Sequence, residues 1–358
     1  MQLQELLSDI RPADAQAARQ AADYCDGLVK PLRSLGRLET LAARLAGITG
    51  KVHNQFPKRT VLVLCSDNGV VEEGVASAPQ SVTLMQTRNF ARGLTGVCVL
   101  AKQAGARVLP IDVGVNGEVG DPRVLDRKIR PGTANIRRGP AMTREEALRA
   151  LLVGAECARE AVDQGDTLLG TGEMGIGNTT TSSAVLCALT GRTPEETTGK
   201  GAGLTEEAYQ AKLAVIRDAL AVNRPDPNDV LDVLAKVGGL DICGMAGVFL
   251  GGASRRVPVV MDGLISSVAA LCAVRLCPAA RDYIIPSHCS KERGYAVAAA
   301  ELGLEPFLLL DMGLGEGSGC PIAFSLIDFA CTMMNDMATF EQAAIDDGFL
   351  DAVKDADF

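Results

Sequence analysis

The segment Gly170-Thr-Gly-Glu-Met-Gly-Ile-Gly-Asn-Thr-Thr-Thr181 determines the expected fold. A mostly apolar run at 167–169 precedes it, and a run of small and apolar residues at 182–189 follows it. This order is typical of a strand, a glycine-rich turn and the start of a helix. The four glycines lack a Cβ atom, so a ligand can approach the backbone closely.

The start of the helix favours an anion in this turn. Asn178 and the three threonines that follow can cap the helix, whose first N–H groups carry the positive end of its dipole. Such a turn accommodates a phosphate. Glu173 would repel a phosphate unless it faces a cationic part of the same ligand. The segment therefore predicts a ligand with a phosphate at one end and a standing or developing positive charge close by.

The same glycines permit two other interpretations. Gly170-x-Gly172-x-x-Gly175 matches the dinucleotide fingerprint, which requires an acidic residue about 20 positions later at the end of a strand. Glu195 and Glu196 lie near that distance, but in a polar loop with no strand before it. A dinucleotide-binding oxidoreductase and a purely structural turn remain as alternatives that the sequence favours less.

Composition limits the class of protein. The chain has 358 residues, 47% of them hydrophobic, with 38 glycines and no tryptophan, which suits one main α/β domain with a smaller appendage. A net charge of −9 argues against nucleic acid or an anionic membrane as a partner. We therefore expect small-molecule substrates.

The cysteines, histidines and apolar runs indicate the compartment. Eleven cysteines are scattered without a Cys-x-x-Cys pair, as expected for buried thiols in a reducing cytoplasm. Two histidines are too few for a histidine-based metal site. The N-terminus is no signal peptide, and Asp262 and Arg275 interrupt the most apolar region, 257–277. We expect a cytoplasmic protein with no membrane span, no metal and no cofactor.

Short apolar runs alternate with helical patterns after residue 58. Nearly continuous apolar runs are typical of parallel strands covered on both faces, and the intervening helices imply right-handed crossovers. Six strands are expected, at 60–65, 107–113, 167–169, 257–261, 283–285 and 306–310. The expected fold is a doubly wound, mostly parallel, Rossmann-like six-stranded sheet.

Both ends of the chain show helical spacing of apolar residues. Helices are expected at 13–29, 38–46, 328–335 and 338–353. The sequence thus predicts a small helical domain from residues 1–55 and 335–358, and a large α/β catalytic domain from residues 56–334.

A polar or glycine-rich segment follows each expected strand. These segments are 66–69, 112–114, the glycine-rich turn, 262–263, 287–290 and 311–319. The carboxyl ends of parallel strands share one edge of the sheet, where such folds bind their ligands. We expect the functional site at this edge.

Glu316 lies within Leu314-Gly-Glu-Gly-Ser-Gly319, at the end of the last expected strand. Partial desolvation can raise the pKa of such a glutamate towards the working pH, so it can act as a general base. The acidic pair and phosphate loop of transferases that use a pyrophosphate donor and Mg²⁺ are missing from the sequence, and Asp346-Asp347-Gly348 has no such loop after it. A phosphate-monoester donor that requires no metal fits better.

Two motifs resemble signatures of the nicotinate-nucleotide:dimethylbenzimidazole phosphoribosyltransferase family. They are Gly172-Glu-Met-Gly-Ile-Gly-Asn-Thr-Thr180 and Leu314-Gly-Glu-Gly-Ser-Gly319. Segments 30–39, 74–79, 258–263 and 287–290 add to the resemblance, which covers residues 28 to 340. It implies a parallel-sheet domain with a small helical domain and, usually, a homodimer or a heterodimer with a homologous chain.

The resemblance also implies a reaction and its residues. Nicotinate mononucleotide gives its 5-phosphoribosyl group to an aromatic base with inversion at C1′, in cobamide assembly. Glu316 is then the general base, and Glu173 assists near the ribose. The donor and its phosphate would contact Gly175, Ile176, Gly177, Asn178, Thr179, Thr180, Lys212, Ser290 and Gly315. The acceptor would contact Ser77, Met85 and Leu314.

Several positions depart from the family pattern. They are Asn68, Tyr295, Gly313, Met85 in place of a glutamine, and the 77–79 segment, which lacks an aromatic residue before its proline. The changes suggest a less polar acceptor wall, which would suit phenol or p-cresol as well as dimethylbenzimidazole. A weakly active or non-catalytic subunit of a heterodimeric transferase remains an alternative.

Overall fold

The computed structural model, which describes residues 1–201 and 203–350, contains one six-stranded sheet in which all strands are parallel. The strands are β1 (Arg59–Ser66), β2 (Arg107–Gly114), β3 (Leu125–Asp126), β4 (Leu168–Met174), β5 (Val259–Met261) and β6 (Ile284–Pro286). Their order is β3-β2-β1-β4-β5-β6, so the direction of winding changes between β1 and β4. This confirms the predicted doubly wound fold.

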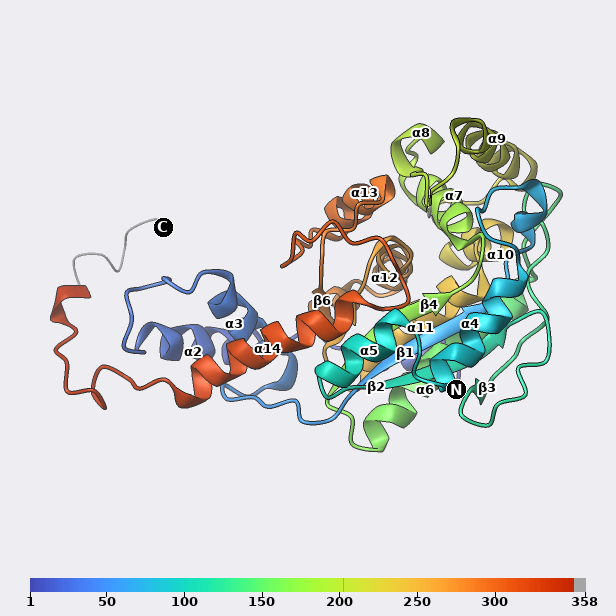
Figure 1. The fold of residues 1–358 in the computed structure, drawn as a ribbon. Helices are drawn as coiled ribbons and strands as arrows, with labels where there is room; N and C mark the ends of the chain where they lie inside the picture. The colour runs from blue at the N-terminus through green and yellow to red at the C-terminus, as the bar shows by residue number, and fades with distance from the viewer. Residues whose placement is uncertain (202, 351–358) are drawn as a thin grey trace.

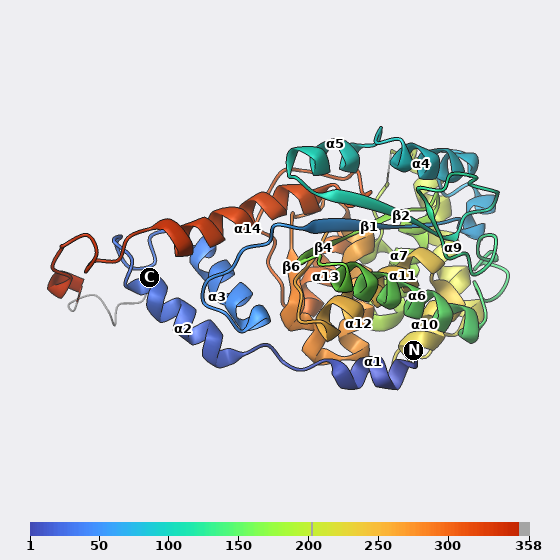
Figure 2. The ribbon, with the colours of Figure 1, turned by 90° about the horizontal axis from the view of Figure 1, so that it is seen from below.

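Helices cover both faces of the sheet (Figure 2). One face packs against α4 (Ser81–Ala91), α5 (Gly96–Gln103) and α14 (Gly319–Asp336). The other packs against α6 (Arg144–Asp163), α11 (Leu240–Ser254) and α12 (Leu264–Leu276). Burial on both faces explains why β1 and β4 lack polar alternation. No helix of the described residues is long and apolar enough to cross a membrane.

Four more helices pack on one another beyond the end of β4 (Figure 1). They are α7 (Asn178–Thr190), α8 (Pro194–Thr197), α9 (Glu206–Asn223) and α13 (Arg293–Leu302), and α10 (Val230–Val237) joins them to α6.

Strand β4 extends further than predicted. It runs through Gly170 and Gly172 to Met174, and the turn begins only at Gly175. Gly170 is needed because a Cβ atom there would lie 2.8 Å from the Cβ of Cys320 on α14. Since these two glycines belong to the strand, they do not form the turn that the dinucleotide fingerprint requires.

The predicted strand at 306–310 is wrong. Only an isolated bridge joins Leu308 to His288, and Leu309 and Leu310 are 82% and 50% exposed. The apolar run therefore marks a surface segment and not a covered strand. The sixth strand is β3, whose two residues are too few to produce a pattern in the sequence.

Helices from the N-terminal part of the chain and the end of α14 lie together on one side of the molecule, away from the N-terminus itself (Figure 1). There α2 (Ala15–Asp26) packs on α3 (Arg37–Thr49), and α3 packs on α14. By contrast, α1 (Leu3–Asp9) packs on α11, beneath the sheet. The predicted helix at 338–353 is wrong over 338–347, where the chain forms turns; 348–350 is a short 3-10 helix, and 351–353 lie outside the described residues. The boundaries of the two domains remain a prediction.

Glycines allow α6 and α11 to touch backbone to backbone. A Cβ atom on Gly154 would overlap the carbonyl of Gly244, and one on Gly247 would overlap the carbonyl of Leu151. This contact brings both helices into one thin layer beneath β1 and β4, and so fixes the position of the strands that carry the site.

We expect Gly154→Ala to destabilise the fold, although alanine favours an isolated helix by about 1 kcal/mol. Overlap with the α11 backbone should lower the free energy of unfolding by at least about 2 kcal/mol in urea denaturation. Gly139→Ala is the control, because a Cβ atom added there would meet no described heavy atom within 4 Å other than those of its chain neighbours. Equal stability of the two variants would contradict the close helix contact.

Candidate active site

A cavity of about 260 Å³ opens at the carboxyl edge of the sheet, beside the end of β4. It is where an α/β sheet that reverses its winding between β1 and β4 is expected to bind a ligand. The predicted residues that line it are Ser77, Glu173, Gly175, Ile176, Gly177, Asn178, Thr179, Lys212, Ser290, Leu314, Gly315 and Glu316. The loops 66–69 and 112–114 instead bond to one another, through the N–H of Asp67 and the carbonyl of Gly114.

Two predicted residues lie outside the lining. Thr180 is buried behind it, and its hydroxyl has no hydrogen-bond partner. Met85 is 58% exposed, and its neighbour Gln86 faces the cavity and donates to Glu316 Oε1 at 3.2 Å. Adjacent residues of a helix project about 100° apart, so an assignment that is wrong by one residue selects a side chain that faces another direction. Gln86, and not the predicted Met85, therefore lines the cavity.

Glu173 is the penultimate residue of β4 and is buried. Its Oε1 accepts the backbone N–H of Glu316 at 3.2 Å, and its Oε2 accepts the side-chain amide of Asn178. Burial, with repulsion from Asp241 and Asp262, raises the pKa of Glu173 to about 8. The carboxyl is therefore mostly protonated at pH 7 until a positive charge approaches it.

The amide of Asn178 joins two buried acids. Besides Glu173, it donates to Asp241 Oδ2 at 3.1 Å, and burial raises the pKa of Asp241 to about 6. The predicted capping role of Asn178 is therefore wrong. The N-cap is Gly177, at φ +94°, and Asn178 instead orients Glu173.

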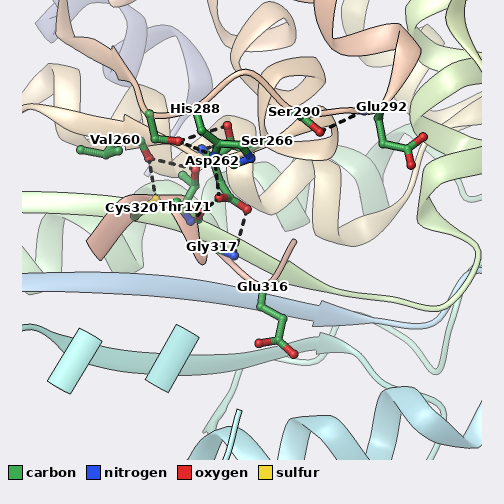
Figure 3. Close-up of polar contacts among 12 residues, drawn as sticks. Thr171, Val260, Asp262, Ser266, His288, Ser290, Glu292, Glu316, Gly317 and Cys320 are labelled. Atoms are coloured by element: carbon green, nitrogen blue, oxygen red, sulfur yellow. Dashed lines mark hydrogen bonds and ion pairs between the residues drawn. The ribbon is translucent and has the colours of Figure 1, made fainter. Parts of the chain in front are cut away.

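Glu316 occupies a left-handed backbone position, with φ +62°. Its flanking glycines also have positive φ, and a Cβ atom on Gly315 would overlap Glu173 Oε1. The Glu316 side chain points away from Asp262 (Figure 3), and its Oε2 accepts the N–H of Val97 at 3.2 Å, in the first turn of α5. Burial raises the pKa of Glu316, while these hydrogen bonds oppose that shift. Glu316 is thus a partly desolvated carboxylate that faces the cavity.

Asp262 holds the loop of Glu316 from the other side. Its Oδ2 accepts the N–H of Gly317 at 3.1 Å and its Oδ1 that of Gly319 at 2.7 Å (Figure 3). Burial raises the pKa of Asp262 to about 7. His288 lies beside it, with Nδ1 3.8 Å from Asp262 Oδ1, and burial lowers the pKa of this imidazole.

Lys212 supplies a buried positive charge to the cavity, whereas Lys200, which also lines it, is paired with Glu206. The Nζ of Lys212 donates to Thr179 Oγ1 at 2.8 Å, and burial lowers the pKa of this ammonium to about 8. Among the described residues, no carboxylate forms an ion pair with Lys212. A buried ammonium without a carboxylate partner favours an anionic ligand.

The sequence predictions omitted six polar residues of the described lining. They are Gln86, Lys200, Asp262, Ser266, His288 and Glu292. Asp262 and His288 lie in the segments 262–263 and 287–290, which the sequence placed at the functional edge of the sheet. Their positions after predicted strands could therefore have identified both as site residues. No group of three or more His, Cys, Asp or Glu residues in the described chain is arranged to hold a metal ion.

We expect the buried acids to make stability depend on pH. Because burial raises the pKa of Glu173 to about 8 from an ordinary 4.5, the folded protein binds more protons than the unfolded chain between these values. The free energy of unfolding should therefore fall as the pH rises through this window. Asp262, with its pKa raised to about 7, adds a change of the same sign.

Glu173→Gln cannot titrate, so its free energy of unfolding should fall less between about pH 5 and pH 8 than that of the wild type. Urea denaturation at both pH values measures the difference. Glu118→Gln, at an exposed position, is the control and should behave as the wild type does. A Glu173→Gln curve that parallels the wild type would show that Glu173 is ionised in the folded protein.

A match to a known family defines the class of enzyme. The family model described as "Phosphoribosyltransferase" matches residues 10–345, nearly the whole chain. The chain is thus a phosphoribosyltransferase with an α/β fold.

Individual relatives define the family more narrowly. The nicotinate-nucleotide–dimethylbenzimidazole phosphoribosyltransferase of Alkaliphilus metalliredigens is 51% identical over 96% of this chain and 99% of its own length. The same-named protein of Clostridium perfringens strain ATCC 13124 is 51% identical over 99% and 98%. The crystal structure of CobT from Thermus thermophilus matches with a TM-score of 0.90 and 43% identity, over 93% of this chain and all of that one. The chain belongs to the nicotinate-nucleotide–dimethylbenzimidazole phosphoribosyltransferase family.

Proposed function

We propose that this enzyme transfers the 5-phosphoribosyl group of nicotinate mononucleotide to a benzimidazole-type base, with Glu316 as the general base. The products are nicotinate and an α-ribotide 5′-phosphate for the lower ligand of a cobamide. The names of the relatives support the reaction. One observation carries the proposal. Lys212, whose ammonium forms no ion pair with a described carboxylate, and Glu316, whose carboxylate is partly desolvated, line the same cavity.

The donor phosphate binds at the Lys212 end of the cavity. Lys212 Nζ and Thr179 Oγ1 are already joined there, at the start of α7. Three N–H groups of the glycine-rich turn are engaged within the protein, since Ile176 donates to Thr83, Asn178 to Gly175 and Thr180 to Gly177. Binding of the phosphate therefore depends more on the Lys212 ammonium and the Thr179 hydroxyl, and less on the backbone N–H groups of the turn, than the sequence indicated.

Glu173 stabilises the positive charge of the donor. The pyridinium ring is cationic, and as its bond to C1′ breaks the ribose takes on oxocarbenium character. This charge favours the ionised form of Glu173, which burial otherwise keeps protonated. Nicotinate leaves with a neutral ring nitrogen, so the leaving group needs neither a proton nor a metal.

Glu316 completes the exchange at the acceptor. One ring nitrogen of the benzimidazole attacks C1′ from the face opposite the leaving pyridine, which inverts the configuration. The proton on the other ring nitrogen passes to Glu316. The carboxylate is suited to accept it because burial raises its pKa, and Gln86 and Val97 fix its orientation.

Gln86 supports a benzimidazole rather than a phenol as the preferred acceptor. The expectation of a less polar wall rested on the 77–79 segment and on Met85, but Met85 does not line the cavity, whereas Gln86 does. With nicotinate mononucleotide and equal amounts of phenol and dimethylbenzimidazole, we expect mass spectrometry to detect mainly the N-linked ribotide. An excess of the O-linked phenolic product would contradict this preference.

We expect Glu316→Gln to keep the fold and donor binding but to lower kcat on the order of 10²- to 10⁴-fold, as loss of a general base does. Product release by mass spectrometry, with the enzyme in excess over the donor, isolates the chemical step. Retention of more than about a third of the wild-type rate would exclude Glu316 as the base. The Glu118→Gln control should keep full activity.

We also propose that the enzyme functions as a dimer with a second homologous chain, identical or not. Leu314, which lines the cavity, is 59% exposed, and Leu309, in the segment that precedes it, is 82% exposed. Native mass spectrometry of the purified chain tests this. A monomer that is active on its own would contradict the need for a partner, and an inactive homodimer would favour the non-catalytic subunit.

A further inference from the structure

Four carboxylates line the cavity, and they differ in how many hydrogen bonds they already accept. They belong to Glu173, Asp262, Glu292 and Glu316. The ribose of a nucleotide donor brings hydroxyl groups, which need acceptors when they are enclosed. Which of the four carboxylates is free to accept them therefore decides where the ribose binds.

Each oxygen of three of the four already accepts a hydrogen bond within the protein. Both oxygens of Glu173 accept hydrogen bonds, from Asn178 and from the N–H of Glu316. Asp262 accepts two backbone N–H groups, and Glu316 accepts Gln86 and the N–H of Val97. A hydroxyl that bound to any of them would have to share an occupied oxygen.

Glu292 differs from the other three. Its Oε2 is buried and has no hydrogen-bond partner within residues 1–201 and 203–350. Its own N–H donates to Ser290 Oγ at 3.3 Å, which joins these two cavity residues at the start of α13 (Figure 3). Gly199 leaves room for the carboxylate, because a Cβ atom there would overlap Glu292 Oε2. The local structure thus keeps open an acceptor that no described residue fills.

The charges around Glu292 indicate the kind of group it accepts. A carboxylate repels a phosphate, so its role is not to bind the anionic end of the donor directly. The cationic ring is accounted for by Glu173, which lies under the Glu316 loop. Burial lowers the pKa of the Lys212 ammonium, and the negative charge of Glu292 opposes that shift because it favours the charged form. Glu292 therefore lies towards the phosphate end of the cavity. Between the phosphate and the pyridinium of a mononucleotide lies the ribose.

We infer that Glu292 is a specificity residue that accepts hydrogen bonds from the ribose hydroxyls of the donor, and so selects ribose over deoxyribose. This inference rests on the proposed function, since it assumes a mononucleotide in the cavity. Burial makes the preference strong, because a donor without the hydroxyl would leave the Glu292 oxygen unpaired.

The test compares kcat/KM for nicotinate mononucleotide with kcat/KM for its 2′-deoxy and 3′-deoxy analogues. The wild type should prefer the ribose donor over at least one analogue on the order of 10- to 100-fold. Glu292→Ala should lose activity with the ribose donor and keep its activity with that analogue, so the preference should collapse to within about threefold. Glu292→Gln, which keeps the shape of the side chain, is a second variant in case the alanine variant unfolds.

Two further variants distinguish a role of Glu292 in ribose binding from other roles of this residue. Lys212→Met should weaken binding of all three donors alike and leave the preference intact. Glu301→Gln, on the outer side of the same helix, should change nothing. If Glu292→Ala instead lowers activity equally with every donor, Glu292 acts on Lys212 and the phosphate, and the inference is wrong.

A wild type that shows no preference among the three donors would also overturn the inference, while leaving the phosphoribosyl transfer intact. By contrast, a wild type that neither binds nor converts nicotinate mononucleotide, in calorimetry and mass spectrometry, would overturn the proposed function itself. The two failures are therefore distinguishable.

Discussion

Two buried carboxylates hold the loop that carries Glu316, and the geometry of the site depends on them. Glu173 accepts the N–H of Glu316, while Asp262 accepts the N–H groups of Gly317 and Gly319. Three consecutive residues in this loop have positive φ, a conformation that needs external support when one of them is a glutamate. The two acids provide it, because they fix the backbone on both sides of Glu316.

This arrangement gives the acids two roles that conflict until a ligand binds. A carboxylate buried this deeply favours its protonated form, and burial raises the pKa of Glu173 to about 8 and that of Asp262 to about 7. The hydrogen bonds to the loop favour the ionised form. A cationic ligand would favour the ionised form of Glu173, so the group that positions the Glu316 loop would also respond to the charge of a bound ligand.

Much of the fold and part of the site could be predicted from the sequence, because their causes are local. Apolar runs and glycine-rich segments identify the parallel strands and the loops at their ends, and the glycines of 314–319 identify Glu316. What could not be predicted depends on contacts distant in sequence. Whether Met85 or Gln86 faces the cavity depends on how α4 is oriented about its axis, which the sequence does not show. The apolar run at 306–310 has the pattern of a strand, and only its exposure in the folded protein shows that it is not one. No sequence pattern distinguishes Glu292, whose special feature is a buried oxygen without a hydrogen-bond partner in the described part of the chain.

Helix α14 connects the chemistry to the far side of the molecule. Its first N–H, that of Gly319, is bound by Asp262, and the helix packs on α3 among the helices from the ends of the chain (Figure 1). Its 18 residues form a stiff rod about 27 Å long. The helix also packs on β4, β5 and α5, so it spans from the sheet that carries the cavity to the terminal helices. A displacement of α3 would therefore bear on the loop of Glu316 through a single stiff element.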